Sequence, residues 1–456
     1  MSSPTLMISV SGMRGIVGTD LTPELVSRHA AALGTWAKNN GKPLVVLGRD
    51  ARTSGAMFAH AATAGLMSVG VTVIDLGVVP TPTVQLAVEH HHAGAGLIIT
   101  ASHNPIAWNA LKFVGPDGIF LDGNAGSTVR ALAETGVARG GWNGIGGLKA
   151  DPEATDRHLA QVLALPEVDA DLIRSKHFHV ALDCVRGAGG AVIPNLLEML
   201  GCRVSAINLE TDGRFPREPE PIPENLGDLS RLVKESGADI GLAVDPDVDR
   251  LAVVDEQGRP IGEDYTLAFA VRAVLGKHQT GPSERQPAVV ANLSTSLVVE
   301  DAAKAGGARF VRAPVGEANV AATIKAERAL IGGEGNGGVI LPALHIGRDA
   351  PLGVALILQL LALDGRRPSE IVAAAPQYRI VKAKSPRGKD LSVLYSGLRA
   401  RFPEATADTR DGLRLSWPDR WVHVRPSGTE PIIRYIAEAP TEAAATELIE
   451  TCQNLV

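Results

Sequence analysis

The stretch IITASHNPIAWNALKF, residues 98–113, decides how the rest of the chain is interpreted. Ile98 and Ile99 end an apolar run that predicts a buried strand, and a polar loop follows them. Pro105 blocks a helical continuation and biases the residue before it toward an extended backbone. We therefore expect Ser102 and His103 on an extended, exposed turn at the carboxyl end of a strand, where open α/β sheets place their chemistry. Alone, the pattern fits either an ordinary turn or a hydroxyl and imidazole that act together as a nucleophile.

Length and composition predict a soluble protein of several domains. The chain has 456 residues, 45% apolar and 21% charged, which predicts ~3 to 4 domains. A net charge of −6 without a basic run argues against nucleic acid as a partner. Neither a signal peptide nor an apolar run of roughly 18 residues is visible, so we expect a cytoplasmic protein without a membrane partner. The three cysteines lack metal-binding spacing and fit a reducing compartment, and nothing marks an oligomer interface.

The order of apolar and turn residues predicts an α/β fold in four parts. Strands expected at 44–48, 71–77 and 96–100 alternate with helices, which indicates a mostly parallel, covered sheet. The same rhythm restarts at about 178 and again near 263, whereas from about 376 the short alternating strands look antiparallel and a final helix begins near 441. We predict three α/β domains and a smaller C-terminal α+β domain, with boundaries at residues 1–150, 151–262, 263–374 and 375–456.

The segment DPDVDR, residues 245–250, is a candidate metal site. Asp245, Asp247 and Asp249 alternate on a loop after an apolar strand, so their carboxylates can converge on one hard cation such as Mg²⁺. Three other interpretations stay open: a solvated acidic turn, a calcium EF-hand, and a phosphatase of the haloacid-dehalogenase type. Arg250 stands where an EF-hand needs glycine, and Asp249 stands where such phosphatases usually have Thr or Val.

Two further loops carry polar groups suited to a phosphorylated sugar. In GGEGNGGVI, residues 332–340, Glu334 and Asn336 can grip hydroxyls while glycines allow close approach; a plain connector remains the alternative. In RPSGTEP, residues 425–431, the arginine, hydroxyls and exposed amides can form an anion nest for a phosphate monoester, and the alternative is a hairpin loop with a surface arginine. The candidate phosphate-binding residues are Arg425, Ser427, Gly428, Thr429 and, just beyond the loop, Arg434.

Taken together, these loops predict phosphoryl transfer on a phosphorylated polyol. Phosphoryl transfer needs charge neutralisation and alignment, which Mg²⁺ with Arg14, Lys112 and Arg250 can supply. Neither G-x-G-x-x-G after a strand nor GxxxxGK[ST] occurs, so a nucleotide donor is not indicated. The phosphoryl group should come from the sugar or from the protein, and Ser102 can carry it.

The four loops resemble those of the α-D-phosphohexomutase family, in the same order along the whole chain. TASHNP is similar to its phosphoserine loop, DPDVDR to its metal loop, GEGNGG to its sugar-binding loop and RPSGTEP to its phosphate-binding loop, while GRDAR (48–52) adds a fifth match. The resemblance implies a four-domain architecture with a central active-site cleft. It also implies a phosphorylated Ser102 whose group passes to a hexose monophosphate, forming a bisphosphate that returns the other phosphate to the serine.

Individual roles follow from the same resemblance. Mg²⁺ would be bound by the three aspartates and a phosphoserine oxygen, while Arg14, His103 and Lys112 would assist proton transfer and charge stabilisation. Substrate contacts are expected from Arg250, Glu334, Asn336, Arg425, Ser427, Gly428, Thr429 and Arg434.

Three departures from the family pattern bear on the substrate. The usual FGT-type segment is ISV (8–10), the usual Asn-Gly before the lysine is Asn-Ala (109–110), and the sugar loop ends in Gly338 instead of the His of GEMSGH or GEQSGH. The GEGNGG form resembles archaeal-type phosphoglucosamine mutases, which favours glucosamine phosphate over glucose or mannose phosphate. A Mg-dependent sugar phosphatase and a non-enzymatic sugar-phosphate-binding protein are the rival predictions.

Overall fold

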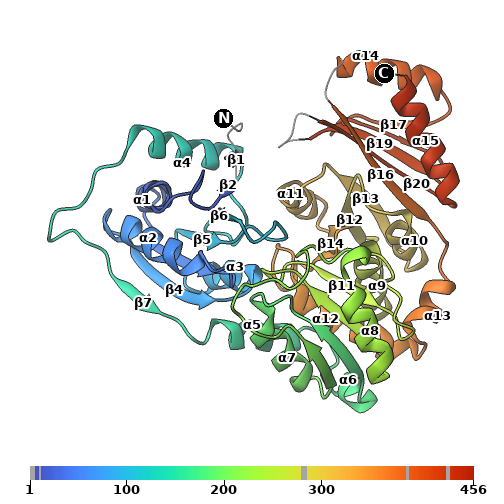
Figure 1. Ribbon diagram of the computed structural model, residues 1–456, viewed down its shortest axis with the longest axis horizontal. Helices are drawn as coiled ribbons and strands as arrows, with labels where there is room; N and C mark the ends of the chain where they lie inside the picture. Colours follow the sequence, from blue (N-terminus) through green and yellow to red (C-terminus); the bar gives the residue numbers. More distant parts are fainter. Residues whose placement is uncertain (1–5, 10–11, 279–284, 387–389, 428–431, 456) are drawn as a thin grey trace.

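The computed structural model describes residues 6–9, 12–278, 285–386, 390–427 and 432–455. Over these residues the strands form four sheets, which follow one another along the chain and define four units (Figure 1). Three units are α/β with mixed sheets and the last is a smaller α+β unit, so the predicted fold class is confirmed. Across the same residues, none of the helices has both the length and the apolar character needed to cross a membrane.

The first unit, blue to teal in Figure 1, has a sheet of order β1-β2-β6-β5-β3-β4-β7. Its elements are β1 (Met7–Ser9), β2 (Gly12–Ile16), α1 (Pro23–Asn39), β3 (Leu44–Arg49), α2 (Gly55–Met67), β4 (Thr72–Val78), α3 (Thr81–His90), β5 (Ala95–Ile99), β6 (Trp108–Val114), α4 (Gly123–Thr135) and β7 (Leu148–Ala150). The prediction of a mostly parallel sheet holds only for β5, β3, β4 and β7, because β6, β2 and β1 pair antiparallel. The stretch 98–113 is therefore a β-hairpin that turns between β5 and β6.

The second unit is a smaller sheet of order β11-β10-β8-β9. Its elements are α5 (Ala154–Leu163), α6 (Ala170–Lys176), β8 (His179–Asp183), α7 (Gly189–Met199), β9 (Arg203–Ile207), the 3-10 helix η1 (Pro223–Asn225), α8 (Gly227–Ser236), β10 (Ile240–Val244) and β11 (Leu251–Val254). The third unit has the order β13-β12-β14-β15. It contains α9 (Glu263–Lys277), β12 (Ala288–Asn292), α10 (Leu297–Ala305), β13 (Arg309–Ala313), α11 (Glu317–Glu327), β14 (Ile331–Glu334), β15 (Gly338–Ile340), α12 (Ala350–Asp364) and α13 (Pro368–Ala373).

One four-strand pattern recurs in the first three units. If β3, β8 and β12 are each counted as the first strand, the order in space is fourth-third-first-second every time, and the third and fourth strands form an antiparallel hairpin. The three hairpin loops are those that contain Ser102, the three aspartates and Glu334–Asn336. The repeat is invisible in residue identity, yet it places three of the predicted loops at equivalent positions.

The fourth unit, red in Figure 1, is an antiparallel sheet of order β16-β20-β19-β18-β17 with two helices, as the sequence predicts. Its elements are β16 (Arg379–Pro386), α14 (Leu391–Arg401), β17 (Thr406–Asp408), β18 (Leu413–Ser416), β19 (Trp421–Pro426), β20 (Ile432–Ala439) and α15 (Glu442–Asn454). The unit contacts the third through two buried side chains. His423 Nδ1 lies 2.9 Å from Ser294 Oγ, and Glu438 accepts hydrogen bonds from the Ser296 hydroxyl and the Leu297 amide at the start of α10.

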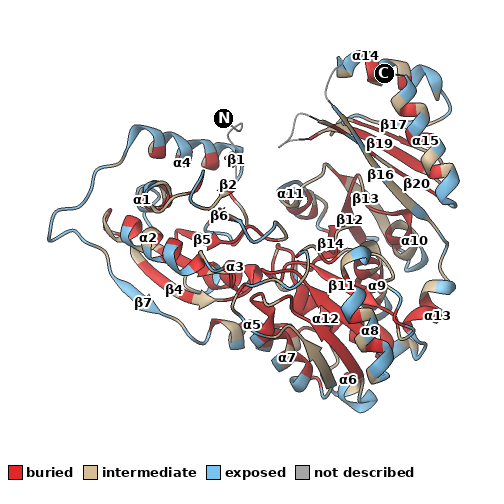
Figure 2. Ribbon diagram, viewed as in Figure 1, coloured by how far each residue is buried: buried red, intermediate tan, exposed pale blue. Residues whose placement is uncertain are grey.

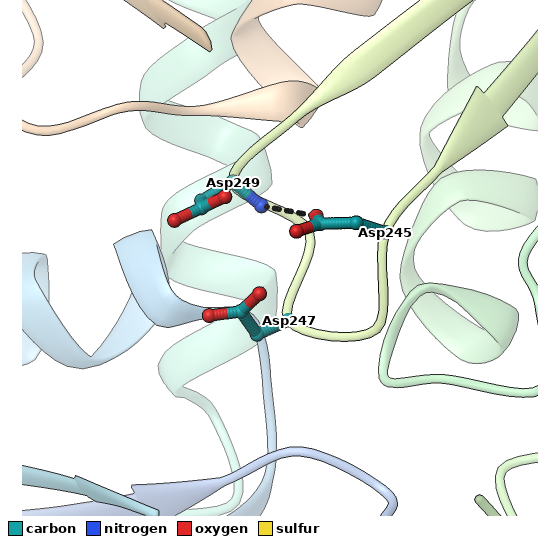
Figure 3. A group of neighbouring side chains, drawn as sticks. All are labelled: Asp245, Asp247 and Asp249. Atoms are coloured by element: carbon teal, nitrogen blue, oxygen red, sulfur yellow. Dashed lines mark hydrogen bonds between the residues drawn. The ribbon is translucent and has the colours of Figure 1, made fainter. Parts of the chain in front are cut away.

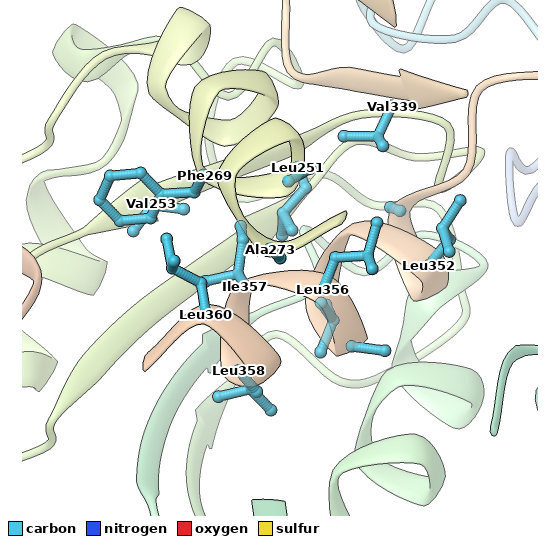
Figure 4. Packing of buried hydrophobic residues seen from close by; sticks show 14 of the residues in the cluster. Leu251, Val253, Phe269, Ala273, Val339, Leu352, Leu356, Ile357, Leu358 and Leu360 are labelled. Carbon is cyan, nitrogen blue, oxygen red and sulfur yellow. The ribbon is translucent and has the colours of Figure 1, made fainter. Parts of the chain in front are cut away.

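The largest hydrophobic core joins the second and third units. Helix α12 is apolar and buried around its whole circumference, which is typical of a central helix. It begins where Asp349 accepts a hydrogen bond from the Leu352 amide and ends at Gly365, whose φ of 76° needs glycine. Figure 4 shows its leucines packed against α9, β11 and Val339 of β15, and Figure 2 shows the same elements as buried. This shared core fixes the β10–β11 loop relative to the β14–β15 loop.

Candidate functional site

The β10–β11 loop brings three aspartates together at the carboxyl end of a buried strand. Val248 has a φ of 61°, and Asp245 Oδ1 accepts hydrogen bonds from the Asp249 and Arg250 amides at 3.1 Å each, which closes the turn. One carboxylate oxygen from each aspartate lies within 4.8 Å of those of the other two. Figure 3 shows the three side chains grouped on this loop. All three side chains are fully buried. The predicted convergence of Asp245, Asp247 and Asp249 is confirmed.

The charges around the aspartates determine which of them stays ionised. Burial raises the pKa of Asp245 well above its usual range, and the neighbouring carboxylates of Asp249 and Asp247 raise it further. Burial would also raise the pKa of Asp247, but the Lys112 ammonium, 2.7 Å from its Oδ2, holds that pKa below its usual value. Burial lowers the pKa of Lys112 itself, yet Asp247 and Asp249 outweigh it and the net pKa is raised. Arg348 is 2.6 Å from Asp249 Oδ2.

The donor set fits a hard divalent cation. Asp247 Oδ1 and Asp249 Oδ1 are buried oxygens without a hydrogen-bond partner among the described residues, although a buried acceptor is normally satisfied. Their positions beside Asp245 match the carboxylate oxygens that Mg²⁺ prefers. Lys112 and Arg348 supply positive charge at the same carboxylates. A cation on the two unpartnered oxygens would explain the arrangement.

The Ser102 loop packs directly on these aspartates, but not as predicted. Ser102 is 3% exposed and has a φ of 49°, so the expectation of an extended, exposed turn is wrong. Its hydroxyl donates to Asp245 Oδ2 at 3.0 Å, a contact between the first and second units that covers the side chain. His103 Nδ1 lies 3.3 Å from the same hydroxyl. The left-handed backbone turns Oγ toward the aspartates.

The Arg52 side chain holds the backbone of this loop by hydrogen bonds. Its Nη1 and Nη2 atoms donate to four backbone carbonyls at 2.6–2.9 Å, those of Ser102, Asn104, Pro105 and Trp108. Its Nε donates to Asp50 Oδ2 at 3.1 Å, and both side chains are buried. Burial raises the pKa of Asp50, while Arg52 and the Thr100 hydroxyl oppose that rise. The predicted site omits Arg52, although the GRDAR match pointed to it.

A pocket of about 340 Å³ opens in front of Ser102. The predicted residues Arg14, Ser102, His103, Lys112 and Arg250 all line it, so the structure brings them together. The other lining residues are Met7, Gly12, Met13, Ala110, Leu111, Phe120, Gly316, Glu317, Ala318, Asn319 and Arg348. With four lysine or arginine side chains, this lining suits an anionic ligand.

Within this pocket His103 is neutral. Burial lowers the pKa of His103 to about 2, and the charges of Arg250, Arg14 and Arg348 contribute in the same direction. Arg14 is oriented by a 2.5 Å hydrogen bond to Asn104 Oδ1. Arg250 pairs with Glu220 at 3.1 Å. The imidazole is therefore a hydrogen-bonding group beside the Ser102 hydroxyl and carries no charge.

The two residues predicted to grip sugar hydroxyls lie beside the pocket lining. Glu334 ends β14 and is buried, with Oε1 accepting from the Asn292 side chain at 2.9 Å and Oε2 from Arg348 at 3.0 Å. Asn336 Nδ2 is 3.5 Å from the same Oε2. The Gly316 amide also donates to Oε1 at 3.2 Å, so both carboxylate oxygens of Glu334 are engaged by the protein in this arrangement.

The predicted phosphate nest is in the fourth unit, separate from the described pocket lining. Arg425 pairs with Asp411 at 3.2 Å and stands opposite Arg434 in the β19–β20 register. Ser427 is buried, whereas Arg434 is exposed. Gly428 and Thr429 lie outside the described residues. Arg425, Ser427 and Arg434 are not among the described residues that line the pocket.

Arg348 and Glu317 are pocket residues that sequence reasoning missed. Arg348 contacts three acidic side chains from separate loops, and Glu317 begins α11. One signal for Arg348 exists in the sequence: the tetrapeptide GRDA occurs at 48–51 and again at 347–350.

Comparisons with known proteins agree with this organisation. The alpha/beta/alpha domains I, II and III of phosphoglucomutase/phosphomannomutase match residues 6–139, 156–258 and 262–378, and the C-terminal domain of that family matches residues 384–453. A phosphoglucomutase/phosphomannomutase of Thermococcus kodakarensis is 39% identical over 96% of both chains. A probable phosphoglucosamine mutase of Methanopyrus kandleri is 37% identical over 98% of this chain and 96% of its own.

A solved structure shows the same architecture over the whole length. The phosphoglucomutase/phosphomannomutase family protein of Burkholderia thailandensis superposes with a TM-score of 0.85 at 25% identity, covering 98% of this chain and 97% of its own. All four units and their order are therefore shared with that protein.

Proposed function

Since the chain belongs to the phosphoglucomutase/phosphomannomutase family and is a phosphohexomutase, we propose that it interconverts the 6-phosphate and 1-phosphate of glucosamine through phospho-Ser102. The observation that supports this most directly is the Ser102 hydroxyl, 3.0 Å from Asp245 Oδ2 and at the wall of a cationic pocket. A phosphoryl group on Oγ would lie between the aspartates and the pocket, within reach of a sugar.

Each half-reaction exchanges one phosphorus–oxygen bond for another. The bond from phosphorus to Ser102 Oγ breaks as a bond to a sugar hydroxyl oxygen forms, and the proton of that hydroxyl passes to Oγ, with the His103 ring 3.3 Å from Oγ as the group that assists the transfer. The resulting bisphosphate reorients within the pocket and transfers its other phosphate to Oγ. Arg14, Lys112 and Arg250 stabilise charge on the transferring group. A dianionic phosphate among these cations would raise the pKa of His103, which makes its ring a better proton acceptor.

Asp245, Asp247 and Asp249, with an oxygen of phospho-Ser102, would hold Mg²⁺. When bound, Mg²⁺ neutralises charge on the transferring phosphoryl group and polarises it. The two unpartnered aspartate oxygens support this assignment, because each has an unused lone pair in a buried site. Once the fourth unit closes, the distal phosphate of the sugar would be bound by the nest of Arg425, Ser427, Gly428, Thr429 and Arg434. Glu334 and Asn336 would contact the hydroxyls of the sugar.

Glu317 supports glucosamine as the sugar. Among the described residues that line the pocket, Glu317 is the single acidic one, and the others are basic or neutral. A 2-ammonium group forms an ion pair as well as a hydrogen bond with this carboxylate, whereas a 2-hydroxyl forms the hydrogen bond alone. The GEGNGG loop and the relative from Methanopyrus kandleri favour the same substrate. Glucose or mannose phosphates are the second candidates, because the Thermococcus kodakarensis relative carries the phosphoglucomutase/phosphomannomutase name.

A coupled assay tests the proposal. Glucosamine 6-phosphate, glucose 1-phosphate and mannose 1-phosphate are compared by kcat/KM with Mg²⁺, and released inorganic phosphate is measured in parallel. We expect the highest value for glucosamine 6-phosphate, and Glu317→Gln should reduce that preference. Ser102→Ala should lower mutase activity by orders of magnitude without unfolding the protein. Near-normal turnover in Ser102→Ala, or phosphate release faster than isomerisation, would reject the phosphoserine mechanism.

A further inference from the structure

Arg348 is the point at which the separate loops of the pocket meet. Its Nη2 donates to Asp249 Oδ2 at 2.6 Å and its Nη1 to Glu334 Oε2 at 3.0 Å. Its Nε forms an ion pair with Glu317 Oε2 at 3.1 Å without hydrogen-bond geometry, and the Arg348 backbone amide donates to Glu317 Oε1 at 3.2 Å. The three carboxylates belong to the β10–β11 loop, the end of β14 and the first turn of α11. A planar guanidinium can serve three acceptors in fixed directions, which an ammonium cannot.

Gly338 provides the space that Arg348 occupies. It stands directly opposite Glu334 in the β14–β15 register, so a side chain at position 338 would share the face of Glu334. A β-carbon on Gly338 would lie 2.2 Å from Arg348 Cδ and 2.8 Å from its Cγ, closer than real contacts allow. The aliphatic part of the Arg348 side chain therefore occupies the space that a side chain at position 338, opposite Glu334, would fill.

The next residue anchors the backbone of Arg348. Asp349 accepts a hydrogen bond from the Leu352 amide at the start of α12, and its Oδ2 also lies 2.8 Å from His158 and 3.0 Å from His345. This buried cluster fixes the point from which the Arg348 side chain extends. The Arg348 side chain is 9% exposed, so little water reaches its ion pairs.

We propose that Arg348 is a positioning residue that couples the metal site to the sugar site, and that Gly338 is required for it. The proposal rests on the proposed function, because Asp249 is taken as a Mg²⁺ ligand and Glu334 as a hydroxyl acceptor. The guanidinium of Arg348 pairs with Asp249 Oδ2, so its positive charge opposes a cation on the neighbouring Oδ1, while it also pairs with Glu334 and Glu317 at the sugar side. Binding of Mg²⁺ therefore weakens the Asp249–Arg348 pair through charge repulsion.

This coupling predicts that loss of the Arg348 guanidinium raises the affinity for Mg²⁺ and lowers kcat/KM. Removing the guanidinium frees Asp249 Oδ2 and removes a positive charge beside the cation site, so we expect Mg²⁺ to bind about tenfold more tightly. The same change removes the guanidinium from Glu334 Oε2 and Glu317 Oε2, which keep the donors on their other oxygens, the Asn292 side chain and the backbone amides of residues 316 and 348. A displacement of these carboxylates by about 1 Å reduces kcat/KM by about 100-fold. A residue needed only for folding would weaken both.

The experiment measures Mg²⁺ binding to the substrate-free protein by titration calorimetry, and kcat and KM separately, for three test variants and two controls. Arg348→Gln removes the charge, Arg348→Lys keeps it without the fork, and Gly338→Ala displaces the side chain by its β-carbon. The controls are Arg272→Gln, whose arginine pairs with Asp364 in the same unit, and Gly276→Ala, where a β-carbon would meet nothing within 4 Å. Arg272→Gln and Gly276→Ala should match the wild type.

We expect tighter Mg²⁺ binding and a raised KM in Arg348→Gln, and smaller changes in the same directions in Gly338→Ala. Arg348→Lys should keep a wild-type Mg²⁺ affinity with a raised KM. Unchanged or weaker Mg²⁺ binding in both Arg348→Gln and Gly338→Ala would overturn the coupling, and if Arg348→Gln does not fold, Gly338→Ala decides alone. A wild-type protein that isomerises none of the hexose phosphates with Mg²⁺ would instead refute the proposed function, which keeps the two failures distinct.

Discussion

Substitution of Arg52 tests whether a buried guanidinium holds the Ser102 loop in its active shape. Arg52→Gln keeps a polar side chain of shorter reach but removes the charge paired with Asp50 and the donors to four loop carbonyls. Removing one partner of a buried ion pair costs about 3–5 kcal/mol. The lost hydrogen bonds do not add fully to this figure, because water and loop relaxation replace part of them. We expect the free energy of opening the loop to fall by about 4 kcal/mol.

Hydrogen exchange of the amides in residues 98–105 measures that opening directly. A loss of about 4 kcal/mol corresponds to exchange faster by about a thousandfold, since each 1.36 kcal/mol is tenfold. Ser102 would also lose its left-handed geometry, which lowers kcat by about 100-fold. Arg28→Gln, on an exposed position of α1, is the matched control and should change neither quantity. Arg52→Lys should fall between the two, because an ammonium cannot reach all four carbonyls.

The reasoning would be refuted by one clear result. If Arg52→Gln leaves both the exchange of residues 98–105 and kcat within about threefold of the wild type, the guanidinium does not hold the loop. Faster exchange spread evenly over the first unit would also contradict it, because the hydrogen bonds of the Arg52 guanidinium within that unit go only to Asp50 and to carbonyls of residues 102–108.

Three further predictions concern the metal site and the fourth unit. Asp247→Asn should raise the Mg²⁺ concentration needed for half-maximal activity at least ~10-fold, measured by metal titration, because one anionic ligand is lost. Burial lowers the pKa of His423, whose ring lies beside Ser294, to about 4. Between about pH 6.5 and pH 4 the unfolded chain therefore binds a proton at this histidine and the folded chain does not, so the free energy of unfolding falls as the pH is lowered through this range. Denaturant unfolding at pH 7 and pH 5 should show a loss of about 2 kcal/mol that His423→Gln lacks. Glu438 accepts hydrogen bonds from the Ser296 hydroxyl, the Leu297 amide and the Trp421 indole. Glu438→Gln replaces one acceptor oxygen by an NH₂ donor, so it should destabilise the fourth unit by about 2–3 kcal/mol in the same unfolding assay.

The residues of the loops and their order along the chain could be predicted from the sequence. Asp245, Asp247 and Asp249 follow an apolar run at alternate positions, and this local pattern is sufficient to place three carboxylates on one turn. The antiparallel character of the C-terminal unit was equally visible, because its short strands alternate between turn residues. The identity of the chemistry followed from combining the loops, since each alone fitted an ordinary turn.

The conformation of Ser102 and the partners of Glu334 could not be predicted. Ser102 is buried because Asp245, 143 positions away, covers its hydroxyl, and because Arg52 draws in its carbonyl from 50 positions away. Glu334 is engaged by Arg348, for which the chain offers a weak signal in the second GRDA. Contacts of this length depend on how sheets and helices pack, and local propensity does not contain that information.

The sequence by itself determined which side chains are available and at which strand ends they occur, because periodicity and turn residues act over a few positions. Tertiary structure alone decided that three units repeat one strand order, that their hairpin loops converge, and that a glycine at 338 leaves room for Arg348. The physical reason is the range of the interactions: a strand and its turn are specified by neighbours, whereas a charge balance among Asp249, Glu334 and Glu317 exists only after separate units have packed on a shared core.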